Sequence, residues 1–228
     1  YSQIELRIMA HLSKDPELIK AFENNEDIHA RTASSVFGVP IADVLPEMRR
    51  TAKVVNFGIM YGAGPFRMSQ ELGIPRGEAQ AIIEVYFKRY YGIQNYIDET
   101  LEMARNNKYV ETMLGRRRPV WDIDSDNHIR REAAKRMAIN MPIQGTAAEM
   151  IKKAMISIHD KINSGGEASG YNKAKMILQV HDELLFEVPE NQVESLTKMV
   201  AFEMENALPL SVPIVVDCGV GNSWFEAH

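Results

Sequence analysis

Helical periodicity dominates the interior of this 228-residue chain, whereas patterns typical of β-strands lie mainly toward its ends. Pro142 lies inside the longest helical segment, where it removes one backbone hydrogen bond and should disturb the helix. Apolar residues recur every three to four positions in the segments Pro16–Asn24, Ile28–Phe37, Pro46–Met60, about Arg76–Asn106, about Asn127–Asn163 and Glu190–Ala207. This distribution predicts a small sheet that carries a helical insertion.

The strand patterns form pairs separated by turn residues, and paired neighbours predict antiparallel hairpins. We expect one hairpin around Gly115, and a second joined by His181-Asp182-Glu183. Apolar and polar residues alternate in Tyr1–Arg7, which suits a short strand or a strand turning into a helix. Ser164–Gly170 is the clearest loop. The predicted strands are Tyr109–Leu114, Arg117–Trp121, Lys175–Val180, Leu184–Val188 and a closing strand at Ile214–Val220. The predicted fold class is therefore α/β, mostly helical, with a small antiparallel sheet.

Composition excludes several classes of protein. Hydrophobic residues make up 45% of the chain and charged residues 25%, values typical of globular proteins. No apolar run approaches the ~18 residues of a membrane span. Cys218 is the single cysteine, so an intramolecular disulfide and a multi-cysteine zinc site are excluded, and a reducing, cytoplasmic location is predicted. Because the chain begins at Tyr1 without an initiator methionine, we expect it to be a piece of a longer protein.

Two cations and two aromatic residues, Arg49, Lys53, Phe57 and Tyr61, are spaced four residues apart. Residues four apart share one face of a helix. Two cations one turn apart suit a polyphosphate, and an aromatic ring suits stacking on a base, a contact that adds ~1–3 kcal/mol. The pattern therefore predicts a nucleoside triphosphate lying along this helix.

The alternative for the same segment is an ordinary amphipathic helix, with its aromatic rings in the core and its cations in solvent. Two features favour the nucleotide interpretation. Gly58 costs a helix about 1 kcal/mol relative to alanine, which indicates a close approach at that position. Ala52, Val55 and Ile59 already supply an apolar side.

A second stripe, Arg136, Asn140 and Gln144, repeats the spacing of four on the predicted long helix. Amide side chains carry both donors and acceptors, and every base pair presents acceptors in the minor groove. Further basic residues nearby suit backbone phosphates: Arg116, Arg117, Arg118, Arg130, Arg131 and Lys135. The net charge of −5 argues weakly against a nucleic-acid partner, and a solvated helix face remains the alternative.

Carboxylates at the predicted second hairpin suit a metal ion. Asp182 and Glu183 follow an apolar strand, and Mg²⁺ in proteins usually takes one or two carboxylates together with substrate phosphates. The alternative is that both residues serve only the turn. Glu5 lies between the apolar residues Ile4 and Leu6, so we expect its carboxylate to be partly buried. Because burying an unpaired carboxylate is costly, partial burial indicates a hydrogen-bonded role.

Taken together, these segments resemble the polymerase domain of the family A DNA polymerases, the bacterial DNA polymerase I type. Tyr1–Arg7 resembles motif A without its leading aspartate, Arg49–Gly62 resembles motif B, and Gln179–Glu183 resembles motif C. Asn140–Ala148 resembles a further segment of the family that contacts primer–template. The likeness extends in order over the whole chain.

The resemblance implies a right-hand architecture that lacks the thumb. The palm would comprise residues 1–22 and 109–228, and the fingers residues 23–108 with the motif B helix at about 47–62. The implied activity is template-directed DNA synthesis in replication and repair. A primer 3′-OH attacks the α-phosphate of a deoxynucleoside triphosphate with two Mg²⁺ ions, and pyrophosphate leaves.

The resemblance also implies roles for individual residues. Asp182 would hold the metal ions, helped by the Tyr1 carbonyl and, less directly, by Glu183. Lys53 would also protonate the leaving pyrophosphate. Glu5 would crowd the 2′ position of the sugar, and Phe57, in place of a tyrosine, would discriminate against dideoxynucleotides. The nucleotide-binding set is Gln3, Glu5, His29, Arg49, Lys53, Phe57 and Tyr61, and the primer–template set is Arg7, Arg136, Asn140, Gln144 and His181.

The chain departs from the family pattern where an aspartate should precede Tyr1. The expected partners are primer–template DNA, deoxynucleoside triphosphates and the missing parts of a parent polymerase, its thumb and N-terminal domains, with no membrane. Without that aspartate we expect the isolated chain to be nearly inactive. The alternatives are a fragment that binds DNA or nucleotide without catalysis, and a helical interaction module with no nucleic-acid role.

Overall fold

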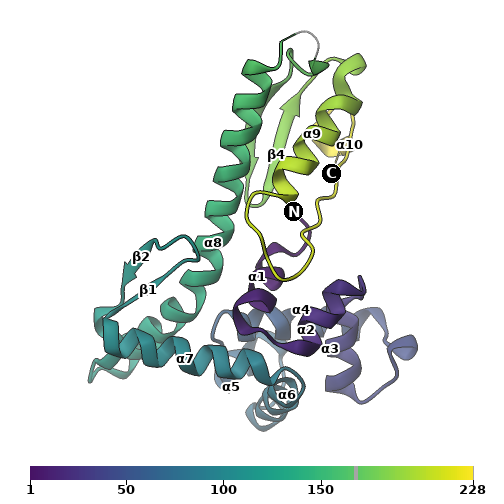
Figure 1. Cartoon of the computed structure of the whole chain (residues 1–228). Coiled ribbons are helices and arrows are strands. Elements are labelled where there is room, and N and C mark those ends of the chain that lie inside the picture. Colours follow the sequence, from purple (N-terminus) through teal and green to yellow (C-terminus); the bar gives the residue numbers. More distant parts are fainter. Residues whose placement is uncertain (167–168, 228) are drawn as a thin grey trace. The chain divides into compact units, whose positions relative to one another are not determined.

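The computed structural model describes residues 1–166 and 169–227, and most of them are helical (Figure 1). The elements are α1 (Ile4–Ser13), α2 (Pro16–Glu23), α3 (Ile28–Phe37), η1 (Ile41–Asp43), α4 (Pro46–Met60), α5 (Pro65–Leu72), α6 (Arg76–Arg89), α7 (Tyr91–Asn107), β1 (Tyr109–Glu111), β2 (Arg117–Pro119), η2 (Trp121–Asp124), α8 (His128–Ser164), β3 (Lys175–Val180), β4 (Glu183–Glu187), η4 (Glu190–Gln192), α9 (Val193–Glu205) and α10 (Trp224–Ala227). The predicted fold class, mostly helical with small antiparallel sheets, is confirmed.

The chain divides into two compact units, each described here by itself. One unit comprises residues 8–146, and the other combines residues 1–7 with the described residues from 147 onward. The dividing points lie within α1 and α8. No helix in the described part of the chain is long and apolar enough to cross a bilayer.

The starts of α2 and α3 in the 8–146 unit follow from aspartate capping residues. Asp15 caps α2 by accepting a hydrogen bond from the Leu18 N–H at 3.0 Å, and its second oxygen accepts from the Gly92 N–H of α7 at 2.8 Å. A side chain on Gly92 would lie 2.7 Å from the Asp15 backbone, so glycine is required there. The fully buried Asp15 carboxylate thereby ties α2 to α7.

Two elements of this unit differ from the sequence predictions. The single helix expected over Arg76–Asn106 is two helices, α6 and α7, because Tyr90 adopts φ −113° and ψ 62° and interrupts the helical backbone. α5 was not predicted. It begins at Pro65 and packs Met68 against α4, where a side chain on Gly58 would meet the Met68 Cε at 2.8 Å. The close approach expected at Gly58 is therefore confirmed.

The hairpin predicted around Gly115 is present as β1 and β2, paired antiparallel with Val110 opposite Arg118. Its buried side packs on α7, η2 and the first half of α8, with Val110, Val120, Ile123 and Ala138 at the centre. The Thr146 hydroxyl of α8 accepts a hydrogen bond from the Met113 N–H at 3.1 Å. A side chain on Gly145 would lie 2.5 Å from the Thr112 methyl group, so this glycine lets the hairpin approach the helix.

The other unit contains the β3–β4 hairpin, which packs against the core that α9 shares with the second half of α8 (Figure 1). Val180 pairs with Glu183, so the turn is His181-Asp182 alone and Glu183 begins β4, one residue earlier than predicted. The predicted helix at Glu190–Ala207 is the short turn η4 followed by α9. The core of this unit contains Ala154, Ile158, Ala174, Leu196, Met199, Val200 and Met204.

The chain ends depart most from the predictions. Tyr1–Arg7 forms no strand, because α1 begins at Ile4 and buries Ile4 and Leu6. Ile214–Val220 has no strand partner among the described residues, and its one backbone bond to the N-terminal segment joins the Ser2 N–H to the Val215 carbonyl at 2.9 Å. A single bond does not make a ladder. The predicted loop Ser164–Gly170 lies partly outside the described residues, at positions 167–168.

Candidate functional site

The four residues of the first predicted stripe follow α4 and its C-cap. Phe57 and Tyr61 are half-buried, with ring centroids 6.0 Å apart, whereas Lys53 is exposed. The core side of α4 is occupied instead by Ala52, Val55 and Ile59, each at most 2% exposed. The aromatic rings are therefore not needed for the core of this helix, which supports the nucleotide interpretation over the amphipathic alternative.

Arg49 begins the stripe and is fixed by a carboxylate that the sequence did not single out. Its Nε donates to the Asp27 carboxylate at 2.6 Å, and the other Asp27 oxygen caps α3 by accepting from the backbone N–H groups of His29 and Ala30. Burial tends to raise the pKa of Asp27. The Arg49 hydrogen bond and the two backbone donors outweigh burial and hold that pKa below its usual value. Asp27 thus links the cationic end of α4 to the start of α3.

His29 lies beside the same stripe. Its ring centroid is 6.0 Å from that of Phe57, and its side chain is almost fully buried at 3% exposure. Nδ1 is 2.9 Å from the Asn56 Nδ2, and Asn56 in turn contacts Thr32. Sequence reasoning missed Asn56 and Thr32; the available signal was an amide on the apolar side of α4. Burial lowers the pKa of His29, Asp27 opposes this change, and Arg49 and Lys53 add to it.

The second stripe follows α8, which continues through Pro142 as one helix. Arg136 and Asn140 are half-buried and Gln144 is exposed. Gly62, with φ +70°, brings the end of α4 against α8, since a side chain there would lie 3.2 Å from both the Arg136 Cγ and the Ile139 Cδ1. The structure therefore brings the cation–aromatic stripe and the polar stripe together.

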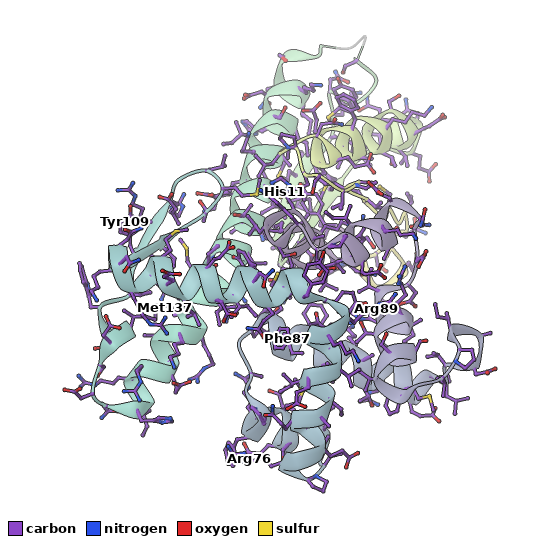
Figure 2. All side chains as sticks on the ribbon, turned by 60° about the horizontal axis from the view of Figure 1, so that its bottom comes forward. His11, Arg76, Phe87, Arg89, Tyr109 and Met137 are labelled. Carbon is purple, nitrogen blue, oxygen red and sulfur yellow. The ribbon has the colours of Figure 1, made fainter. Side chains whose placement is uncertain are left out.

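The basic residues of the hairpin are partly neutralised by neighbours. Arg117 donates to Glu111 at 3.1 Å and lies 4.4 Å above the Tyr109 ring, which Figure 2 labels on the hairpin. Lys135 donates to Glu132 at 2.7 Å. Arg118 and Arg130 are exposed. These two are therefore better placed than Arg117 to meet an external phosphate.

The predicted metal-binding turn is tight and tied to the start of the chain. His181 has φ +50°, and a positive φ at the first position is common in two-residue hairpin turns. The Gln179 Nε2 donates to the His181 carbonyl at 2.6 Å, and the Tyr1 backbone nitrogen donates to the Asp182 carbonyl at 3.0 Å. The Tyr1 hydroxyl donates to the Met204 carbonyl at 3.0 Å. The structure thus brings together Tyr1, Asp182 and Glu183.

The remaining predicted residues of the N-terminal segment occupy different environments. Gln3 carries a buried Oε1 without a hydrogen-bond partner among the described residues, and Glu5 is half-buried. Arg7 is only 5% exposed and donates to the backbone carbonyls of Ser2 at 2.8 Å and Pro213 at 2.5 Å. Burial lowers the pKa of Arg7, and Asp217 opposes this change. Arg7 therefore anchors the N-terminal segment, and its contact with DNA stays a prediction.

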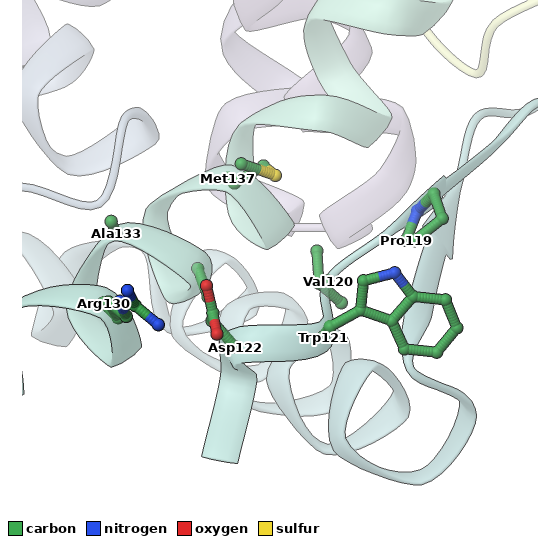
Figure 3. Close-up of a pocket in the computed structure, with 8 residues that line it drawn as sticks. Pro119, Val120, Trp121, Asp122, Arg130, Ala133 and Met137 are labelled. Atoms are coloured by element: carbon green, nitrogen blue, oxygen red, sulfur yellow. The ribbon is translucent and has the colours of Figure 1, made fainter. Parts of the chain in front are cut away.

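No preformed metal cluster accompanies the predicted site residues in the described part of the chain, and a shallow cavity found there is lined by other residues. The described residues contain no cluster of three or more His, Cys, Asp and Glu side chains that could hold a metal ion. A shallow cavity of about 240 Å³ lies between η2 and α8 (Figure 3). Its lining is Pro119, Val120, Trp121, Asp122, Arg130, Ala133, Ala134 and Met137. None of the predicted catalytic, nucleotide-binding or primer–template residues lines it.

Comparison with known proteins identifies relatives of the whole chain. It is 48% identical over 227 residues to the thermostable DNA polymerase I of Thermus aquaticus, which covers 100% of this chain and 26% of the relative. It is 49% identical over 226 residues to the DNA polymerase I of Caldicellulosiruptor bescii; this match covers 99% of this chain and 26% of the relative. The chain thus spans about a quarter of the length of these relatives.

A solved structure agrees with these relatives. The POL domain of Pol1 from M. smegmatis, in complex with DNA primer-template and dNTP, superimposes with a TM-score of 0.94 and 46% identity, over 100% of this chain and 39% of that one. The family model of DNA polymerase family A matches residues 1–226. The resemblance that motifs A, B and C suggested is therefore confirmed, and the chain belongs to DNA polymerase family A.

Proposed function

We propose that this chain supplies the palm and fingers of a DNA-directed DNA polymerase, which adds deoxynucleotides to a primer 3′-OH in replication and repair. The observation that carries the proposal is the row of His29, Phe57 and Tyr61 beside two cations on α4, in a chain of this family. We assign residues 1–22 and 109–228 to the palm and 23–108 to the fingers.

The α4 row provides the parts of a triphosphate site in order. Arg49 and Lys53 bind the phosphates, with His29 as an added donor, and Phe57 stacks on the base. Lys53 donates a proton to the leaving pyrophosphate. Arg49 is held by Asp27, so its guanidinium enters the site with little conformational entropy left to lose. Tyr61 shapes the end of the row that meets α8.

Each unit contributes residues to the proposed primer–template set. Arg136, Asn140 and Gln144 test minor-groove acceptors, while Arg7 and His181 support the primer terminus. Two of the assigned side chains, Gln3 and Asn140, each carry a buried oxygen without a protein hydrogen-bond partner in the described structure. Such oxygens are uncommon in folded proteins and are explained by a bound ligand or water. Glu5 excludes the 2′-OH of ribonucleotides.

The donor set at the His181-Asp182 turn suits Mg²⁺. Mg²⁺ usually takes one or two protein carboxylates and completes its shell with water and substrate phosphates. Asp182 and Glu183 supply carboxylates, and the backbone bond from Tyr1 to Asp182 keeps the first residue beside them. Bound ions would neutralise charge on the α-phosphate and lower the pKa of the primer hydroxyl. The role of this chain is to hold Asp182 on a rigid two-residue turn.

The test is primer extension by the full-length protein that contains this chain. Asp182→Asn should abolish extension while DNA affinity stays close to the wild-type value. The matched control is Asp160→Asn, an exposed aspartate of the same unit, which should extend normally. Extension by Asp182→Asn at the wild-type rate would refute the assignment of Asp182 to the metal site.

A second candidate function is binding of DNA or nucleotide without catalysis. The chain spans about a quarter of the length of its relatives, which favours this candidate for the 228 residues alone. We separate the two functions by measuring primer extension and DNA binding side by side on the full-length protein that contains this chain. Extension supports the polymerase. Salt-dependent DNA binding without extension supports the second candidate.

A further inference from the structure

A buried chain of hydrogen bonds runs from His29 through α4 to the start of α7. The His29 Nδ1 is 2.9 Å from the Asn56 Nδ2, and the Asn56 Oδ1 is 3.0 Å from the Thr32 hydroxyl. The Thr32 hydroxyl lies 3.2 Å from the Tyr90 hydroxyl. Asn56, Thr32 and Tyr90 are each 1% exposed, so water does not compete for these bonds. The direction of each bond in this chain is therefore coupled to the direction of its neighbour.

Such a chain has two possible polarities. If Tyr90 donates to Thr32, then Thr32 donates to the Asn56 Oδ1, and the Asn56 amide N–H donates to the His29 Nδ1. The reverse polarity would turn the Asn56 amide around and require a proton on the His29 Nδ1. The state of Tyr90 therefore decides the tautomer of a histidine at the other end of the chain.

Two features of Tyr90 select the first polarity. A phenol is more acidic than an aliphatic hydroxyl, so Tyr90 is the better donor of the pair. Burial and the charge of Asp15 raise the pKa of Tyr90, while the Thr32 hydrogen bond and the charges of Arg31 and Arg89 oppose this rise. Figure 2 labels Arg89, at the end of α6. The Thr32 hydroxyl donates its one proton to the Asn56 Oδ1, so the Tyr90 hydroxyl is the donor of the bond between Tyr90 and Thr32.

We propose that Asn56 is a positioning residue that holds His29 as the neutral tautomer with its proton on Nε2, so that Nε2–H donates to a phosphate oxygen of the nucleotide. This inference rests on the proposed function for its ligand, whereas the tautomer rests on the buried chain alone. The substrate group that it recognises is a phosphate oxygen. Thr32 and Tyr90 act through Asn56.

The surroundings of His29 suit this role. The groups that face it are Asp27 from the cap of α3 and Arg49 and Lys53 from α4; burial and the two cations lower its pKa, and Asp27 raises it. A neutral imidazole carries a single N–H, so the nitrogen that bears the proton decides whether the ring can donate to a phosphate oxygen. With Asn56 donating to Nδ1, the ring offers a donor at Nε2, for which the described residues provide no other hydrogen-bond partner. The opposite tautomer would present a lone pair to an anionic oxygen.

The tautomer is tested by long-range ¹H–¹⁵N spectra of histidine-labelled protein without nucleotide, with His29→Gln identifying the His29 signals. We expect a protonated Nε2 and an unprotonated Nδ1 at pH 7. In Asn56→Asp, an isosteric carboxylate that only accepts, Nδ1 should become protonated. Thr100→Val, which removes a buried threonine hydroxyl on α7, is the matched control and should leave the signals unchanged. A protonated Nδ1 in the wild-type protein, or unchanged signals in Asn56→Asp, would overturn the inference.

The phosphate contact is tested by titration with dATP in the absence of DNA. His29→Ala should lose roughly tenfold in affinity, the order expected for one hydrogen bond to a charged group. The ratio of the dATP affinity at pH 6 to that at pH 8 should be several-fold larger for Asn56→Asp than for the wild type. In the variant, His29 gains a proton over this range. Protonation of dATP itself changes the affinity of every variant equally, so it does not affect the comparison between variants. Unchanged affinity in His29→Ala would overturn the phosphate contact and the proposed nucleotide role of His29, while the spectra decide the tautomer separately.

Discussion

Replacing Gly62 by alanine tests the contact that joins the two functional stripes. Gly62 follows the last residue of the α4 stripe, and its backbone has φ +70°. The added methyl group would lie 3.2 Å from the Arg136 Cγ and 3.2 Å from the Ile139 Cδ1. Both distances are shorter than the ~3.5–4.0 Å at which two carbon atoms attract most strongly.

The structure allows the expected loss of stability to be separated into two parts. An L-residue in the left-handed region costs about 1–2 kcal/mol, and the reduced freedom of the unfolded chain returns about 0.4–1 kcal/mol. Overpacking against α8 adds about 1–3 kcal/mol. Gly73 provides the matched control, because it has φ +68° and no atom within 4 Å of an added methyl group. We therefore expect a loss of ~1 kcal/mol for Gly73→Ala and ~2–3 kcal/mol for Gly62→Ala.

The assay is urea unfolding of both variants, with DNA affinity measured on the folded protein. Gly62→Ala should bind primer–template more weakly than Gly73→Ala, because its methyl group displaces Arg136. Equal free energies of unfolding for the two variants would show that α4 does not meet α8 at this position. The reasoning that joins the two stripes would then be refuted.

Three further predictions concern single side chains. Glu5→Ala in the full-length protein should raise ribonucleotide incorporation relative to deoxynucleotide incorporation in a primer-extension assay, and an unchanged ratio would mean that Glu5 is not the gate. Phe57→Tyr should raise incorporation of dideoxynucleotides; continued discrimination would remove Phe57 from the sugar-sensing position. Asp27→Asn should destabilise the fold at pH 7. The folded-state pKa of Asp27 is lowered, so its contribution is complete above its unfolded value of about 3.9 and is lost as the pH falls through the folded value. Unfolding curves of wild type and Asp27→Asn should converge only below about pH 4, and a constant difference down to pH 3 would contradict the assigned Asp27–Arg49 pair.

Local patterns predicted most helices of this chain because their causes are local. Periodicity predicted the bounds of α3 and α4. The α4 stripe was also predictable, because residues four apart lie on one face of a helix whatever surrounds it. The turn at His181-Asp182 was located within one residue for the same reason. The interruption at Tyr90 was missed because the sequence on both sides of it is equally helical.

Long-range contacts account for the rest. Thr32, Asn56 and Tyr90 meet across separations of 24 and 58 residues, so their hydrogen bonds leave no periodic signal in the sequence. Ile214–Val220 has the composition of a strand but no ladder partner among the described residues, and strand composition cannot reveal whether a partner exists. Asp27 was missed as the partner of Arg49 because ion pairing depends on where α3 begins.

The contacts of the first seven residues constrain the order in which the chain folds during synthesis. Tyr1 binds the Met204 carbonyl and Arg7 binds that of Pro213, so the N-terminal segment waits for more than 200 residues to be translated before these partners exist. Residues 8–146 form a continuous unit and can fold while the ribosome is still producing the remainder. The contacts of Tyr1 with Asp182 and Met204 therefore form only after the α4 row has been translated and can have folded.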